Sequence, residues 1–149
     1  MTHAWPAPLT NPTKLQIFTN TTNKKIELIY PELSYKIMGA IFEVFNNLGY
    51  GYQEKYYQKA LCKIFKILKI QFKEQVPFNI RFKGEIIGRY FFDFLIENKI
   101  ILELKKETNF RKHHIQQLYG YLKASNLKLG IIVNFTKDGV KFKRILNLY

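Results

Sequence analysis

Cysteine is nearly absent from this sequence, in which Cys62 is the only one among 149 residues. A single thiol forms no internal disulfide and cannot build a zinc site from clustered cysteines. Cys62 lies in the apolar segment ALCKIFKIL, a pattern that favours a buried and unreactive thiol. Because the chain has no disulfide framework, we expect it to work in a reducing compartment and predict a cytoplasmic location.

Long hydrophobic runs are also lacking. No run approaches the roughly 20 apolar residues of a membrane-spanning helix, so we predict no membrane partner. The N-terminal segment MTHAWPAPLTNPTK has no basic start followed by an apolar core, unlike a secretory signal. The composition, 47% hydrophobic and 16% aromatic, is far from that of disordered chains, and 149 residues suit a single domain. We therefore expect a soluble, folded protein.

Acidic residues are scarce. Lys and Arg number 24 against 11 Asp and Glu, which gives a net charge of +13 at pH 7. A positive field of this size attracts polyanions and speeds their capture, so nucleic acid is the leading partner class, ahead of an anionic membrane surface. A lysine-rich surface without a specific partner is the alternative. Charge indicates a class of partner and not an activity.

The sequence divides into a leader and one domain. Residues 1–25 are rich in Thr, Asn and Pro without periodicity, which predicts a loosely ordered leader. The domain is expected over residues 26–149, with a short strand around IELIY at its start. Apolar residues three and four apart predict a helix from Leu33 to Leu48, ended by Gly49, and further helices over residues 53–69 and 110–125.

Strands are expected between the helices. The segment 72–106 contains three β-rich runs separated by KG and ENK, a pattern typical of an antiparallel meander. The apolar run LKLGIIVNF predicts a central strand, and the tail after DG a last short strand or helix. The order α, α, β, β, β, α, β predicts an α/β fold in which helices flank a mixed sheet, made of the antiparallel meander plus a central strand.

Three charged residues, Asp93, Glu103 and Lys105, lie in the apolar segment RYFFDFLIENKIILELKK, where burial of an unpartnered charge is costly. If ENK is a three-residue loop, Asp93 lies directly opposite Glu103 on one face of the hairpin, and Lys105 shares that face. Carboxylates this close repel each other unless a cation lies between them or one is protonated. The other face then carries the apolar residues Phe92, Phe94, Leu102 and Leu104.

Converging carboxylate oxygens suit Mg²⁺ or Mn²⁺, which bind through a few carboxylates and substrate phosphates. A neighbouring lysine can activate the attacking water or offset charge in the transition state. Together these residues indicate metal-dependent hydrolysis of a phosphodiester. The alternative is that Asp93 and Glu103 are exposed strand carboxylates paired with lysines.

The order Asp93, Glu103, Leu104, Lys105 on a hairpin after a helix resembles the core of the PD-(D/E)XK nuclease superfamily. One departure is that Phe92, and not proline, precedes the aspartate. The resemblance implies a restriction-endonuclease-like fold in which Asp93 and Glu103 bind Mg²⁺ or Mn²⁺ and Lys105 is the catalytic lysine. It also implies a nucleic-acid substrate. The sequence does not decide between DNA and RNA, and we favour DNA.

A closer resemblance is to the GxxExxY protein family. Its naming motif runs here from Gly51 through Glu54 to Tyr57, and the segments HIQQLYGYL and KLGIIVNF resemble its C-terminal half. The resemblance covers residues 33–146 and implies that Glu54 adds a third carboxylate to the metal site. The alternative for Glu54 is a cap-like role, since a carboxylate at the start of a helix is favoured by about 0.3–1 kcal/mol.

Residues after Lys105 could extend the site. Gln117 and Tyr121 are four apart on the expected helix, where Gln117 could hold a water, a phosphate or Lys105; packing is the alternative for both. Adjacent histidines point about 100° apart on a helix, so His114 is expected to contact phosphate or solvent and not a metal. Further contacts to the phosphate backbone are expected from Lys106, Arg111 and Lys112.

Two further functions remain open at this point. The chain could be a nucleic-acid-binding module that keeps the nuclease fold without chemistry, or an interaction subunit that binds another protein through its aromatic residues. Since many enzymes of this fold cut two strands as dimers, a homodimer is a further expectation.

Overall fold

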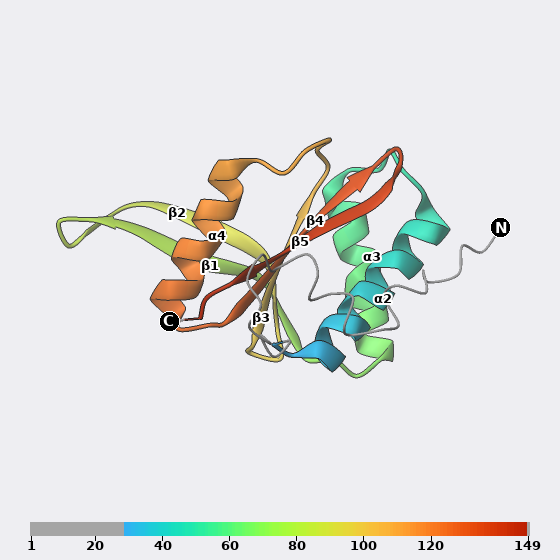
Figure 1. Ribbon diagram of the computed structural model, residues 1–149, viewed down its shortest axis with the longest axis horizontal. Coiled ribbons are helices and arrows are strands. Elements are labelled where there is room, and N and C mark those ends of the chain that lie inside the picture. Colours follow the sequence, from blue (N-terminus) through green and yellow to red (C-terminus); the bar gives the residue numbers. More distant parts are fainter. Residues whose placement is uncertain (1–28, 149) are drawn as a thin grey trace, which may run out of the picture.

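The computed structural model describes residues 29–148 (Figure 1). The expected leader at residues 1–25 and most of the strand expected around IELIY lie outside the described residues. Ile29 and Tyr30 form a bend, after which the first described helix begins.

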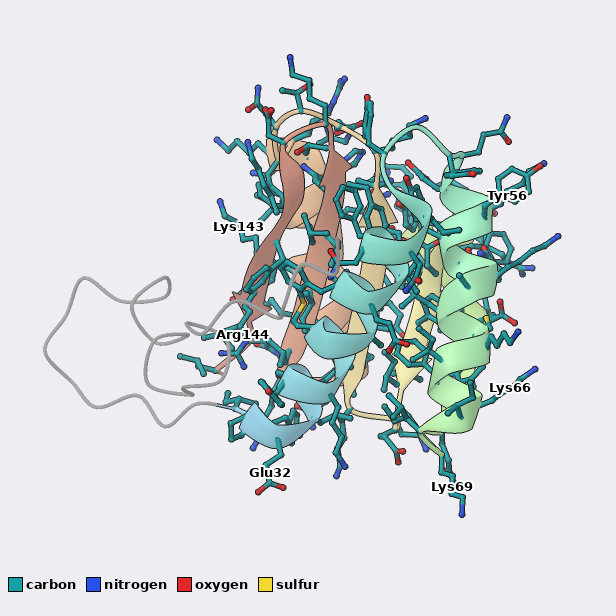
Figure 2. All side chains as sticks on the ribbon, turned by 90° about the vertical axis from the view of Figure 1, so that its right-hand side faces the viewer. Glu32, Tyr56, Lys66, Lys69, Lys143 and Arg144 are labelled. Atoms are coloured by element: carbon teal, nitrogen blue, oxygen red, sulfur yellow. The ribbon has the colours of Figure 1, made fainter. Side chains whose placement is uncertain are left out.

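Two helices open the fold as the apolar spacing predicts. Helix α2 spans Pro31–Leu48, with its proline in the first turn. An N–H at that position has no acceptor within the helix, so proline costs no hydrogen bond there. It ends at Gly49, whose φ of 75° lies in the left-handed region that favours glycine. Helix α3 spans Glu54–Ile67 and lies beside α2 in front of the sheet (Figure 2).

Five strands form one mixed sheet in the order β1-β2-β3-β4-β5. The expected meander is confirmed, since β1 pairs antiparallel with β2 and β2 with β3, while β3 and β4 are parallel. Strand β4 is buried along its whole length between β3 and β5, and the tail forms a strand. The strands are β1 Phe72–Phe82, β2 Glu85–Ile96, β3 Ile100–Lys105, β4 Leu129–Thr136 and β5 Gly139–Leu146.

Helices cover both faces of the sheet, as the α/β prediction requires. On one face α2 and α3 pack against a cluster that includes Phe94, Leu102 and Leu104. On the other face lies α4, Lys112–Ser125, which joins β3 to the parallel β4 and packs against Ile101 and Ile132 (Figure 1). Alternation along β3 therefore directs Glu103 and Lys105 toward the α4 face. Within residues 29–148, no helix combines the length and the apolarity that crossing a membrane requires.

Phe92 corrects one expectation about the faces. Phe94 packs against α2 and α3, but Phe92, two residues earlier, packs on the α4 side with Tyr121. The register of the β1–β2 hairpin places Gln75 opposite Asp93, and Gln75 has a φ of 50°, outside the range of regular strands. The hairpin turns over at this point, so simple alternation fails for the residues before Asp93.

Candidate active site

Asp93 and Glu103 lie where β2 and β3 separate. The ladder follows the predicted register and ends at the pair Phe94 and Leu102, so the next pair is Asp93 and Glu103. The Asp93 backbone N–H donates to Oε1 of Glu103 over 3.1 Å, and the Leu104 N–H donates to Oδ2 of Asp93 over 2.7 Å. Each carboxylate thus accepts a hydrogen bond from the backbone of the opposite strand, which brings both acids to one point.

Glu103 is held in a dry environment. Only 4% of the residue is exposed. Burial raises the pKa of Glu103 to about 9, and the neighbouring Asp93 adds to this, while Tyr90 and Lys105 act in the opposite direction. The two carboxylates therefore repel each other, as expected from the sequence, and a bound cation or a retained proton relieves this repulsion.

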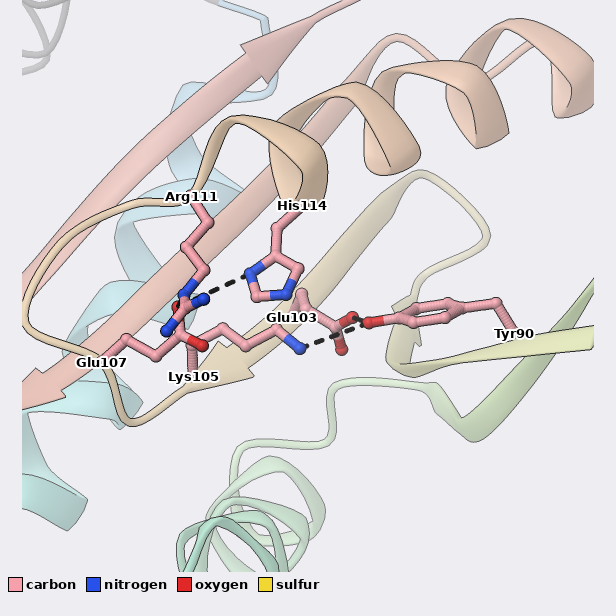
Figure 3. Close-up of polar contacts among 6 residues, drawn as sticks. All are labelled: Tyr90, Glu103, Lys105, Glu107, Arg111 and His114. Carbon is pink, nitrogen blue, oxygen red and sulfur yellow. Dashed lines mark hydrogen bonds and ion pairs between the residues drawn. The ribbon is translucent and has the colours of Figure 1, made fainter.

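Tyr90 links Glu103 to Lys105. Its hydroxyl donates to Oε2 of Glu103 over 2.5 Å and accepts from Nζ of Lys105 over 3.3 Å (Figure 3). Burial, then the contact with Glu103, raises the pKa of Tyr90, so the hydroxyl keeps its proton and remains a donor. Sequence reasoning missed this residue, because simple alternation placed it on the face away from Lys105; the change of face at Gln75 brings it to the site.

Glu54 approaches the pair from the first residue of α3. Partial burial raises the pKa of its carboxylate, Lys105 lowers it and Asp93 raises it, so Glu54 lies within electrostatic reach of both residues. The Lys106 backbone N–H also acts on this carboxylate. Across residues 29–148, however, no three His, Cys, Asp or Glu side chains form a group that could hold a metal ion. Glu54 is therefore near the two acids without completing a three-carboxylate set with them.

The donor chemistry of the pair fits Mg²⁺ or Mn²⁺. Both acids offer hard oxygen atoms at one point, and Mg²⁺ commonly uses only one or two carboxylates, with waters and substrate phosphates as its other ligands. A cation here would also offset the repulsion that acts on Glu103. Two carboxylates are thus a sufficient protein contribution for this kind of ion.

The start of α4 supplies a second polar group. Glu107 binds Arg111 over 3.1 Å and lies 3.7 Å from Nδ1 of His114, a half-buried side chain (Figure 3). Burial, then Lys105, lowers the pKa of His114, so this imidazole stands in the field of the lysine. His114 thus lies within electrostatic reach of Lys105, and Arg111 is paired with Glu107 just before α4.

The other residues expected at the site differ in their burial and contacts. Gln117 is half-buried on α4 and makes no side-chain hydrogen bond within the part of the chain that the structure describes. Tyr121 is 8% exposed and packs against Phe92 and Phe78, so it belongs to the core and is not placed for nucleic acid. Lys112 is exposed, and Lys106 is held by the carbonyl of Gly51 at 3.1 Å.

Comparison with known proteins identifies the superfamily of this chain. A search among curated proteins found no match. Among solved structures, the crystal structure of SSO0001 is similar, with 16% identity over 93% of this chain and 75% of that chain and a TM-score of 0.48. A similarity this weak decides nothing about function. The profile of the PD-(D/E)XK nuclease superfamily matches residues 31–145, a range that contains every site residue described above. This chain belongs to the PD-(D/E)XK nuclease superfamily.

Proposed function

We propose that this protein is a Mg²⁺- or Mn²⁺-dependent nuclease that hydrolyses phosphodiester bonds of nucleic acid, with DNA rather than RNA as its substrate. The observation that carries the proposal is the pairing of Asp93 with Glu103 where β2 and β3 separate, with Lys105 joined to Glu103 through Tyr90. Superfamily membership supports the reaction class.

In this proposal Asp93 and Glu103 hold the metal ion, and Glu54 assists from the start of α3. When bound, the ion supplies Lewis-acid stabilisation of the phosphate and lowers the pKa of a coordinated water. Lys105 orients the attacking water and balances negative charge that builds up on the phosphoryl group. Gln117 supports the site from α4, and Arg111, Lys112 and His114 contact the phosphate backbone on either side.

We further propose membership of the GxxExxY family, on the motif that runs from Gly51 to Tyr57. The three residues that name the motif make different contacts: Glu54 approaches the acids, the carbonyl of Gly51 accepts from Lys106, and Tyr57 donates to the carbonyl of Gly49 over 2.5 Å.

We also propose a cytoplasmic location and a homodimer that offers one site to each strand of a duplex. Cell fractionation and sedimentation test them.

Cleavage assays on single variants test the catalytic proposal. Purified protein is incubated with linear duplex DNA, single-stranded DNA and RNA in Mg²⁺ or Mn²⁺. Asp93→Asn, Glu103→Gln and Lys105→Ala should each lower the rate by roughly 100-fold or more. Glu32→Gln and Lys36→Ala are matched controls, because both residues are exposed near the start of α2, at the opposite end of that helix from Gly49 and the Gly51–Tyr57 motif. Undiminished metal-dependent cleavage by all three site variants would refute the assignment.

A second candidate function is a nucleic-acid-binding module without chemistry. The observation that favours it is the missing third metal-binding side chain within residues 29–148. Such a module would bind nucleic acid with strong salt dependence but would show no turnover in any divalent metal. Cleavage that depends on Lys105 excludes it.

A further inference from the structure

The outer half of the β1–β2 hairpin, residues 77–91, projects past α4 and is here called the arm (Figure 1). On soluble proteins, a group of large and exposed apolar side chains often marks a site of interaction. Five such residues are 39% to 64% exposed on the arm: Ile80, Phe82, Ile86, Ile87 and Phe91.

The arm is also positively charged. Arg81, Lys83 and Arg89 are exposed, and Glu85 is the one acidic residue within residues 77–91. All the ion pairs found within residues 29–148 belong to Glu107, so none of the three cations has an acidic partner there. Arg81 donates to the carbonyl of Gly84, Arg89 donates to Oδ1 of Asn79, and Lys83 lies 5.5 Å from the centre of the Phe82 ring. These neutral contacts leave the positive charge of the arm unbalanced.

Strand β2 connects the arm directly to the candidate active site. Tyr90 and Asp93 belong to this strand, and the turn at Gly84 lies nine residues before Asp93. At about 3.3 Å per residue the tip lies roughly 30 Å along the strand from the acids. One turn of duplex DNA is about 34 Å long. A duplex bound at the acids can therefore reach the arm about one helical turn away.

We propose that the arm binds the nucleic-acid substrate outside the position of cleavage. Arg81, Lys83 and Arg89 bind phosphates, and the ring of Phe82 packs against sugars or bases beside them. Cations interleaved with exposed aromatic and apolar side chains suit such a partner, since the charge recognises the backbone and the apolar groups recognise sugar and base surfaces. This proposal rests on the proposed nuclease function for the identity of the substrate.

A second copy of this chain fits the arm less well. If two arms paired, the unbalanced cations of one would stand against those of the other, and like charges facing each other across an interface are costly. The net charge of +13 on each chain adds to this repulsion. A polyanion has the complementary charge.

Binding to a fluorescent 30-base-pair DNA duplex tests the proposal. The assay contains EDTA and no divalent metal, so it measures binding without cleavage. The arm variant is Arg81→Gln, Lys83→Gln, Arg89→Gln. Its control changes three exposed helical lysines, Lys36→Gln, Lys63→Gln and Lys66→Gln, which alters the net charge equally; Lys66 points away from the sheet (Figure 2). A third variant, Phe82→Ser, tests the apolar contact at a residue that is 60% exposed, so folding should be unaffected.

The arm variant should raise Kd about tenfold or more at moderate salt and reduce the slope of log Kd against log salt by about 2 to 3. The control should change the slope by less than half as much, and Phe82→Ser should weaken binding at every salt concentration without changing the slope. Equal effects of the arm variant and the control would overturn the proposal. So would a parent dimer in sedimentation that the arm variant dissociates. This binding assay is independent of the cleavage assays. A parent that binds through the arm here but cleaves no substrate there would refute the nuclease function and leave the arm proposal intact.

Discussion

Asp93 and Glu103 exchange hydrogen bonds with the backbone of each other's strand at the point where β2 and β3 separate. Oε1 of Glu103 accepts from the N–H of Asp93, and Oδ2 of Asp93 accepts from the N–H of Leu104. Side chains thus continue the contact between two strands whose backbones no longer pair. This arrangement fixes both carboxylates before any ligand binds, which is the preorganisation that the proposed metal-assisted reaction requires.

The first prediction concerns the pH dependence of stability without metal. Burial and Asp93 raise the pKa of Glu103 from 4.5 to about 9 in the folded protein. Between these values the folded state binds a proton that the unfolded state has released, so the free energy of unfolding should fall as pH rises through this window. Urea titrations in EDTA at pH 5, 7 and 8.5 measure it.

Glu103→Gln is the control for this titration, because the amide has no proton to lose. The difference in unfolding free energy between the parent and Glu103→Gln should change steadily across the three pH values. A difference independent of pH would mean that Glu103 ionises normally in the folded protein.

Tyr90→Phe should slow cleavage by about 10- to 100-fold. The variant removes a hydroxyl that contacts Glu103 and Lys105, and a hydrogen bond to a charged group contributes about 1.5–3 kcal/mol. Because the hydroxyl holds Lys105 and does not contact distant parts of a substrate, kcat should fall more than KM rises. Steady-state kinetics separate the two effects.

Tyr119→Phe is the matched control, since this half-buried tyrosine lies on α4 with Lys123 over its ring. It should leave kcat unchanged. Equal losses in the two variants would assign the effect of Tyr90 to packing.

Cys62 should react slowly with thiol reagents in the folded protein. Burial raises its pKa to about 12, the hydrogen bond to Glu74 adds to this, and only 8% of the residue is exposed. The thiolate is the reactive form, so modification by iodoacetamide at pH 8 should be much slower than in denaturant. Mass spectrometry over time measures both rates, and equal rates would contradict the buried position.

Gly130→Ala should destabilise the packing of α4 on β4 by about 1–3 kcal/mol. A Cβ at this position would lie 2.7 Å from Cδ2 of Leu118, which is 1% exposed and has little space to move. At Gly120 on α4, an added Cβ would meet no atom within 4 Å outside the backbone of its own helix, so Gly120→Ala should stabilise α4 by up to about 1 kcal/mol. Thermal melts compare the two, and a stabilised Gly130→Ala would show that Leu118 adapts freely.

Much of the fold could be predicted from local patterns. The spacing of Ile37 and Ile41 on α2, and the three-residue loop between Ile96 and Ile100, follow from periodicity and turn chemistry alone. That loop sets the register of the hairpin and therefore the pairing of Asp93 with Glu103. Short-range rules were sufficient there because the residues concerned are close in sequence.

The rest of the site depends on features that no local pattern encodes. The left-handed backbone of Gln75 turns the hairpin over, which moves Phe92 to the other face and brings Tyr90 to Lys105. Glutamine carries no signal for such a conformation. Tyr121 shares its spacing with Gln117, and only the packing of α4 on the sheet decides that Tyr121 is buried.

Calorimetric titration of Mn²⁺ at low salt and neutral pH tests the central claim most directly, with the parent and Glu103→Gln compared side by side. The account predicts that the parent binds Mn²⁺ and that binding is lost in Glu103→Gln, while Glu32→Gln, a control at an exposed acid in the first turn of α2, binds as the parent does. Equal Mn²⁺ binding by the parent and Glu103→Gln, or no binding by either, would contradict the claim that Asp93 and Glu103 form a metal site.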